Sequence, residues 1–171
     1  GSSWTNVGDN LASLTYGAIA IDPNNPNTVY AGAGEILYNF SPFIYEGQGL
    51  YKTTDAGATW SQVTSGFGNT THFGDLQVSP HNSNLVFAAL GSGYWHRGNL
   101  SNEGIWRSTD GGVSWTRTLF VNDAFDVIVH PTNSTRVFAA AGGGVTTGGF
   151  WISFDGGITW SQSNTGLPSA S

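Results

Sequence analysis

The chain has 171 residues, of which 39% are hydrophobic and only 9% charged, and its five Lys and Arg residues leave a net charge of −6. This balance argues against a nucleic-acid partner, which needs a basic surface, and no apolar run is long enough to form a membrane span. With 25 Gly and no Cys, we expect small stacked sheets without disulfides.

The first predicted element is a strand within residues 1–10. Its segment Trp4-Thr5-Asn6-Val7 matches Trp60-Ser61-Gln62-Val63 later in the chain. The later segment is expected to be the fourth and last strand of a repeated unit. Residues 1–10 are therefore expected to form an outer strand with no unit of its own in front of it.

Three similar units follow, at residues 11–66, 67–120 and 121–171. Each is expected to contain an alternating strand, a Pro-containing turn and a second, small and apolar strand. A variable loop then leads to a third strand, an eight-residue phrase and a fourth strand. Because the apolar residues alternate with period two between Gly, Pro and Asn, each unit is predicted to be a four-stranded antiparallel sheet.

The eight-residue phrase reads Ser/Thr-x-Asp-x-Gly-x-Ser/Thr-Trp and begins at Thr53, Ser108 and Ser153. We interpret it as a tight turn in which Asp accepts backbone N–H groups, Gly adopts a positive φ and Trp buries its ring. We expect these residues to be structural. They are Asp55, Gly57, Trp60, Asp110, Gly112, Trp115, Asp155, Gly157 and Trp160.

Successive Trp residues of the phrase lie 55 and 45 residues apart, a spacing typical of the blades of a β-propeller. The predicted fold class is therefore all-β, with three blades and an extra outer strand. Because a closed ring usually needs about four to eight blades, we expect either part of a longer propeller or a ring completed by further copies of the chain. Two copies would supply six blades.

Strand order places the turns of the phrase on one face and the variable loops on the other. The first two loops combine aromatic rings with charged groups, which suits a sugar ligand, although the same rings could cover a gap between blades or contact another copy. The candidate ligand-binding residues are Glu35, Tyr38, Tyr45, Tyr94, Trp95, His96 and Arg97.

Asp75 and Asp126 occupy equivalent positions near the start of the first strand in the second and third units. Because these strands should line a central channel, we expect the two carboxylates to face its mouth. Two carboxylates that flank a sugar can perform acid and base hydrolysis, whereas each could equally cap the preceding loop. We expect no metal ion and no cofactor.

Four Asn-x-Ser/Thr sequences stand at Asn39, Asn69, Asn99 and Asn133, each in a predicted loop. A surface rich in Ser, Thr, Asn and Gly with little charge also suits an extracellular β-protein. We therefore expect a secreted protein that contacts a glycan or polysaccharide.

The three intact phrases resemble those of the Asp-box, or BNR-repeat, β-propellers, which include sortilin-type receptor domains and the family 74 glycosidases. The run from Asp22 to Ala31 and the opening Trp4–Val7 segment are most similar to family 74 repeats. This resemblance implies a glycoside hydrolase acting on β-glucan, with Asp75 or Asp126 as a catalytic carboxylate. Those enzymes are two complete propellers with one such Asp from each, so the alternative is a non-catalytic interaction or self-assembling module.

Overall fold

A computed structural model describes residues 1–13, 15–36, 47–63, 65–68, 71–91, 102–142 and 148–166. Within these ranges the secondary structure consists of strands, which form three four-stranded antiparallel sheets. The strands are β1 (Tyr16–Ile21), β2 (Val29–Ala33), β3 (Leu50–Thr53), β4 (Ser61–Val63), β5 (Phe73–Ser79), β6 (Asn82–Leu90), β7 (Gly104–Ser108), β8 (Thr116–Leu119), β9 (Ala124–Val129), β10 (Val137–Ala141), β11 (Gly149–Ser153) and β12 (Ser161–Gln162).

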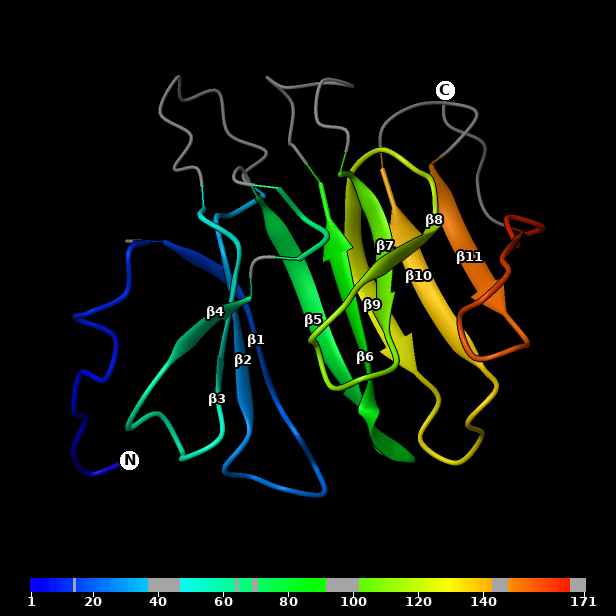
Figure 1. The fold of residues 1–171 in the computed structure, drawn as a ribbon. Coiled ribbons are helices and arrows are strands. Elements are labelled where there is room, and N and C mark those ends of the chain that lie inside the picture. The colour runs from blue at the N-terminus through cyan, green and yellow to red at the C-terminus, as the bar shows by residue number, and fades with distance from the viewer. Residues whose placement is uncertain are drawn as a thin grey trace, which may run out of the picture.

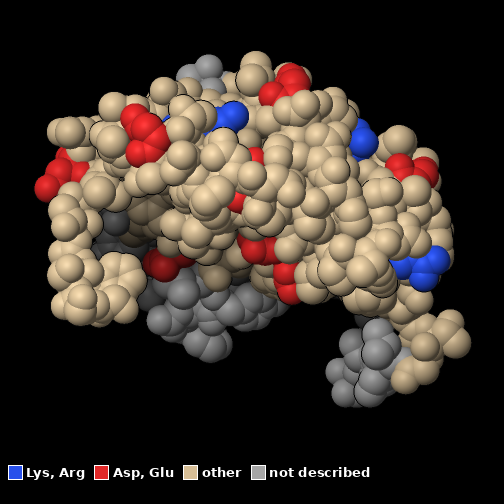
Figure 2. Space-filling view, turned by 90° about the horizontal axis from the view of Figure 1, so that it is seen from below, with Lys and Arg blue, Asp and Glu red and all other residues tan. Residues whose placement is uncertain are grey.

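Each sheet takes its strands in chain order, β1-β2-β3-β4, β5-β6-β7-β8 and β9-β10-β11-β12, and we call them blades one, two and three. The blades stand side by side, with the inner strands β1, β5 and β9 next to one another (Figure 1). Seen from below, they form an arc around a hollow (Figure 2). The all-β fold of four-stranded propeller blades predicted from the sequence is confirmed.

The N-terminal segment differs from its expected form. Among the described residues no strand precedes Tyr16, and Trp4 is 92% exposed. A fourth strand must pair with the third strand of its own blade, and no sheet offers residues 4–7 such a partner. The segment nevertheless lies against blade one, since the Val7 side chain comes within 3.3 Å of the position that a Cβ on Gly57 would take.

The hydrophobic core lies between blades rather than within one. The sheets are stacked face to face, so both faces of a middle blade are covered. Tyr30 and Leu50 of blade one pack with Leu76 and Val86 of blade two in one cluster. A second cluster joins blade two to blade three and contains Phe87, Ala89, Ile105, Val127, Val129, Val137 and Ala139.

The turn between the third and fourth strands of each blade is held by its Asp side chain. In blade one, the Thr59 backbone and hydroxyl donate to the Asp55 carboxylate at 2.8 and 2.7 Å. The Thr53 hydroxyl donates to Asp55 at 2.7 Å and accepts from the Gly57 N–H at 3.0 Å. These hydrogen bonds, led by the one from the Thr59 hydroxyl, lower the pKa of Asp55 to about 2.

The turns of blades two and three repeat this pattern. Ser108 donates to Asp110 at 2.8 Å and Ser153 donates to Asp155 at 2.7 Å. Ser114 N–H and Thr159 N–H each donate to their Asp at 2.9 Å. The pKa of both carboxyl groups is lowered for the same reason. The residues of the repeated phrase therefore share one hydrogen-bonded geometry.

The same turns join neighbouring blades. A Cβ on Gly112 would lie only 2.8 Å from the Tyr30 ring of blade one, and a Cβ on Gly157 would lie 2.4 Å from the Phe87 ring of blade two. The blade that provides the ring also provides a cation. Lys52 Nζ donates to the Gly111 carbonyl at 2.7 Å, and Arg107 Nε donates to the Gly156 carbonyl at 2.9 Å. Each joint therefore consists of a ring seated on a glycine and a cation on a turn carbonyl.

One turn carries a strained residue that can be tested. Ala56 has φ 57°, whereas the equivalent positions are Gly111 and Gly156. Left-handed backbone costs a non-glycine residue about 1–2 kcal/mol, and the extra freedom of unfolded Gly offsets about 0.4–1 kcal/mol of the relief. We expect Ala56→Gly to raise the free energy of unfolding by about 0.5–1 kcal/mol, measured from denaturant midpoints at constant m.

Ala58→Gly is the matched control, because Ala58 is also exposed in this turn but has no positive φ. There the substitution only adds freedom to the unfolded chain and should lower stability by about 0.4–1 kcal/mol. A loss of stability in both variants would contradict the assignment of strain to Ala56.

Candidate functional site

The described strand ends place the three variable loops at one end of the blades. Ala33 pairs with Tyr16, Leu90 with Phe73 and Ala141 with Ala124, so each second strand ends beside the start of its inner strand. We call this the loop end; it is the upper end in Figure 1. The Asp turns lie at the opposite end, which we call the turn end.

Most predicted ligand residues belong to loops whose structure is outside the described residues. The same holds for three of the four Asn-x-Ser/Thr acceptors. These positions are Tyr38, Tyr45, Tyr94, Trp95, His96, Arg97, Asn39, Asn69 and Asn99. What the described stems show is that the loops carrying the ligand candidates leave from the same end.

Two of the remaining candidates lie at opposite ends. Glu35 is half-buried at the stem of the first loop and bridges in parallel to Phe73, at the loop end. Asn133 is exposed in the Pro turn of blade three, at the turn end, and its side-chain oxygen accepts the Thr135 N–H at 3.0 Å. Glu35 is thus the described ligand candidate that lies beside the loops.

Asp75 does not face the channel as expected. Its carboxylate accepts the Val127 N–H of β9 at 3.2 Å, so it bridges the inner strands of blades two and three. Two residues on, the Gln77 side chain accepts the Val129 N–H in the same way. The reason is the stacking of the sheets: alternate side chains of an inner strand point toward one neighbouring blade or the other, and its edge faces the hollow.

Asp126 is exposed, and it neighbours Asp75 closely enough to affect the ionisation of that carboxyl group. Burial raises the pKa of Asp75 to about 6, and the neighbouring Asp126 adds to the rise, whereas the Val127 N–H opposes it.

Buried polar residues that the sequence did not single out also lie at the loop end. Glu103 is 2% exposed, and its Oε2 accepts the Asp123 N–H at 3.3 Å, while its Oε1 has no hydrogen-bond partner among the described residues. Asp123 is equally buried and adopts φ 49°. His72 is 1% exposed. A single acid at a loop stem gives no periodic signal, so only the structure reveals these residues.

No group of three or more metal-ligating side chains occurs among the described residues. Nor does the described part of the chain hold a helix capable of crossing a membrane.

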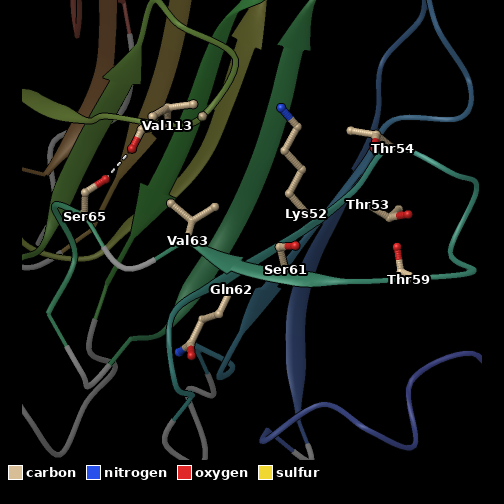
Figure 3. A pocket seen from close by; sticks show the side chains of 10 residues that line it. Lys52, Thr53, Thr54, Thr59, Ser61, Gln62, Val63, Ser65 and Val113 are labelled. Atoms are coloured by element: carbon tan, nitrogen blue, oxygen red, sulfur yellow. Dashed lines mark hydrogen bonds between the residues drawn. The ribbon is translucent and has the colours of Figure 1, made fainter.

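A groove of about 430 Å³ runs along the outer rim between blades one and two (Figure 3). Hydroxyl groups line it, but much of its polar surface is already bonded within the protein. Thr53 and Thr59 donate to Asp55, Ser65 donates to the Val113 carbonyl, and Lys52 donates to Gly111. We therefore regard this groove as part of the joint between blades, and the loop end as the candidate functional site.

The raised pKa of Asp75 predicts a pH dependence of stability. The unfolded carboxyl titrates near 3.8 and the folded one near 6, so the folded state binds the proton more tightly. The contribution of Asp75 is full below about pH 4 and is lost as pH rises through about 6. Between about pH 4 and pH 7 we therefore expect the free energy of unfolding of Asp75→Asn to rise relative to that of the wild type. Denaturant unfolding at a series of pH values measures this difference.

The Asp turns do not interfere, because their lowered pKa values confine their own losses to pH below about 4. Asp126→Asn is the second variant. Removing the neighbouring carboxyl should lower the pKa of Asp75 and so narrow the pH range over which its contribution to stability is lost. Parallel stability curves for the wild type and Asp75→Asn would show that the Asp75 carboxyl is not perturbed.

Comparison with known proteins agrees with this architecture. No family model matches the chain. A xyloglucanase of Hypocrea jecorina (strain QM6a) is 31% identical over 144 residues, which are 77% of this chain and 16% of that protein. The chain thus spans about one-sixth of the length of this relative.

Two solved structures share the fold. The GH74 enzyme of Niastella koreensis superposes with a TM-score of 0.63 and 27% identity, covering 86% of this chain and 22% of that one. YCF48 from Cyanidioschyzon merolae has a TM-score of 0.54 at 18% identity, covers 88% of this chain and 38% of that one, and shows likeness of fold alone. The chain is a β-propeller segment related to the GH74 xyloglucanases.

Proposed function

We propose that the chain is a glycan-binding segment of a secreted, GH74-like β-propeller, and that its loop end contacts a β-glucan such as xyloglucan. The observation that carries this proposal is the 31% identity to a xyloglucanase across 77% of the chain. Fold alone would not suffice, because unrelated functions share the propeller.

The arrangement of the loops supports the proposal. The described stems place the three variable loops at one end, and the sequence puts Tyr38, Tyr45, Tyr94 and Trp95 in the first two. Aromatic rings stack on the C–H faces of sugars, while neighbouring charged side chains bind hydroxyl groups. Glu35, at the stem of the first loop, is placed for the second role.

We further propose that this chain binds glycan without hydrolysing it by itself. Asp75 already accepts a backbone N–H of β9, and the cleft that the family resemblance implies needs one catalytic Asp from each of two propellers, whereas the described blades stand side by side in one.

Secretion belongs to the same proposal. Asn133 is exposed at the turn end, so a glycan attached there would leave the loop end open. The weakly charged surface visible in Figure 2 is consistent with an extracellular protein.

The test is binding of xyloglucan oligosaccharide to the chain, measured by calorimetry or by NMR titration. We expect Trp95→Ala to weaken binding about tenfold or more, because it removes a stacking platform of roughly 1–3 kcal/mol. Trp4→Ala is the matched control: Trp4 is 92% exposed in the N-terminal segment, away from the loop stems, and its loss should leave binding unchanged.

Binding that is absent in the wild type, or equal in both Trp variants, would contradict the proposed glycan site. The release of reducing ends provides an independent readout. We expect none from the chain alone, and turnover that disappears in Asp75→Asn would overturn the non-catalytic assignment.

A further inference from the structure

A side chain of the fourth strand makes the same hydrogen bond at the loop end of every blade. Gln62 of blade one and Gln162 of blade three each donate through Nε2 to the carbonyl just before the glycine at the entry to the third strand, at 2.6 and 2.8 Å. In blade two the donor is Arg117, whose Nη1 donates to the Glu103 carbonyl at 2.8 Å. A glutamine therefore suffices for this contact, and Arg117 adds a positive charge and further N–H donors.

Blade two also has an extra residue beside Arg117. Thr118 opposes no residue of β7, because the register shifts between Arg117 and Leu119, whereas β4 of blade one pairs without a shift. Such a bulge redirects the side chains that follow it and is common beside functional sites. Beyond this one, Phe120 is 67% exposed, and the guanidinium carbon of Arg117 lies 4.0 Å from the centre of its ring. Blade two has a neighbour on each side, so this exposure is not that of an uncovered blade face.

The segment that carries Phe120 is anchored on both sides of the ring. Leu119 and Val121 are 6% and 4% exposed and belong to the core between blades two and three. Two residues further on, the Asp123 N–H donates to Glu103 Oε2 at 3.3 Å. An aromatic ring held in this way loses little conformational entropy when a ligand covers it.

The two side chains suit an uncharged sugar. The guanidinium lies over one face of the Phe120 ring and leaves the other for the C–H face of a sugar. The remaining N–H groups of Arg117 make no hydrogen bond within the described part of the chain and can donate to hydroxyl groups. Partial burial lowers the pKa of Arg117, and the nearby Glu103 carboxylate opposes this change. Because that carboxylate already balances the positive charge, a neutral ligand is favoured over an anionic one.

We propose that Arg117 and Phe120 form a sugar-binding subsite at the loop end of β8, for an uncharged pyranose unit of a β-glucan. The subsite lies at the same end as the variable loops, because the preceding Leu119 pairs with Ile105 near the start of β7, where the second loop returns to its sheet. The inference rests on the proposed function and extends its contact surface from the loops to the outer strand of the middle blade.

The experiment is titration of the full chain with xyloglucan oligosaccharide, followed by calorimetry or NMR. We expect Phe120→Ala to weaken binding about three- to tenfold, because it removes a stacking face. Arg117→Gln copies the residue of blades one and three, so it should keep the hydrogen bond to the Glu103 carbonyl and the melting temperature of the wild type. It should nevertheless weaken binding by a similar factor, since the charged donors are lost.

Phe154→Ala is the matched control. Phe154 is 57% exposed and has the Arg136 guanidinium carbon 4.7 Å from its ring centre, but it belongs to the Asp turn of blade three, at the turn end. Its removal should leave binding unchanged. An equal loss of binding in Phe154→Ala and Phe120→Ala would overturn the subsite.

The failure of the subsite and the failure of the proposed function give different results. Unchanged binding in Phe120→Ala and Arg117→Gln, with weaker binding in Trp95→Ala, would overturn the subsite alone. Weaker binding in Phe120→Ala and Arg117→Gln, with no change in Trp95→Ala, would support the subsite and remove the loop platform. A wild-type chain that binds no oligosaccharide would overturn both, and tighter binding of an oligogalacturonide would overturn the assignment of an uncharged sugar.

Discussion

The contact between the second glycine of the Asp turn in blades two and three and the ring of the preceding blade determines how the blades are arranged. Gly112 under Tyr30 and Gly157 under Phe87 leave no space for a Cβ, and both glycines need a positive φ. The Asp hydrogen bonds hold that backbone shape, and the cation of the preceding blade binds the adjacent carbonyl. The conformation of these turns therefore fixes how neighbouring blades pack, because the turn belongs to one blade and the aromatic ring that packs on it belongs to the preceding blade.

The same stacking decides what the inner strands can do. Their side chains point toward neighbouring blades, so Asp75 and Gln77 satisfy backbone N–H groups of β9 instead of facing the hollow. A carboxyl group in this position is partly desolvated, which explains the raised pKa of Asp75. The Asp75 carboxyl group on inner strand β5 therefore helps to hold blades two and three together.

Much of the fold could be predicted from the sequence because its signals repeat. Alternation with period two, the Pro turns and the Asp phrase each occur three times, so strand order and the two ends of the blades follow. Alternation identifies two faces of a strand but not what each face meets, and this is why the direction of Asp75 could not be predicted. The burial of Glu103 and His72 depends on neighbours from other strands, which leave no local pattern in the sequence.

Amide hydrogen exchange at Gly57, Gly112 and Gly157 tests the central claim most directly. Each N–H donates to the Ser or Thr hydroxyl of its own turn, at 3.0, 2.9 and 2.8 Å, so the three turns are locally alike. If the seated ring stabilises the turn, Gly112 and Gly157 should exchange far more slowly than Gly57 in the monomer. Equal protection at all three glycines would show that the turns are held by their own hydrogen bonds alone and would contradict the account.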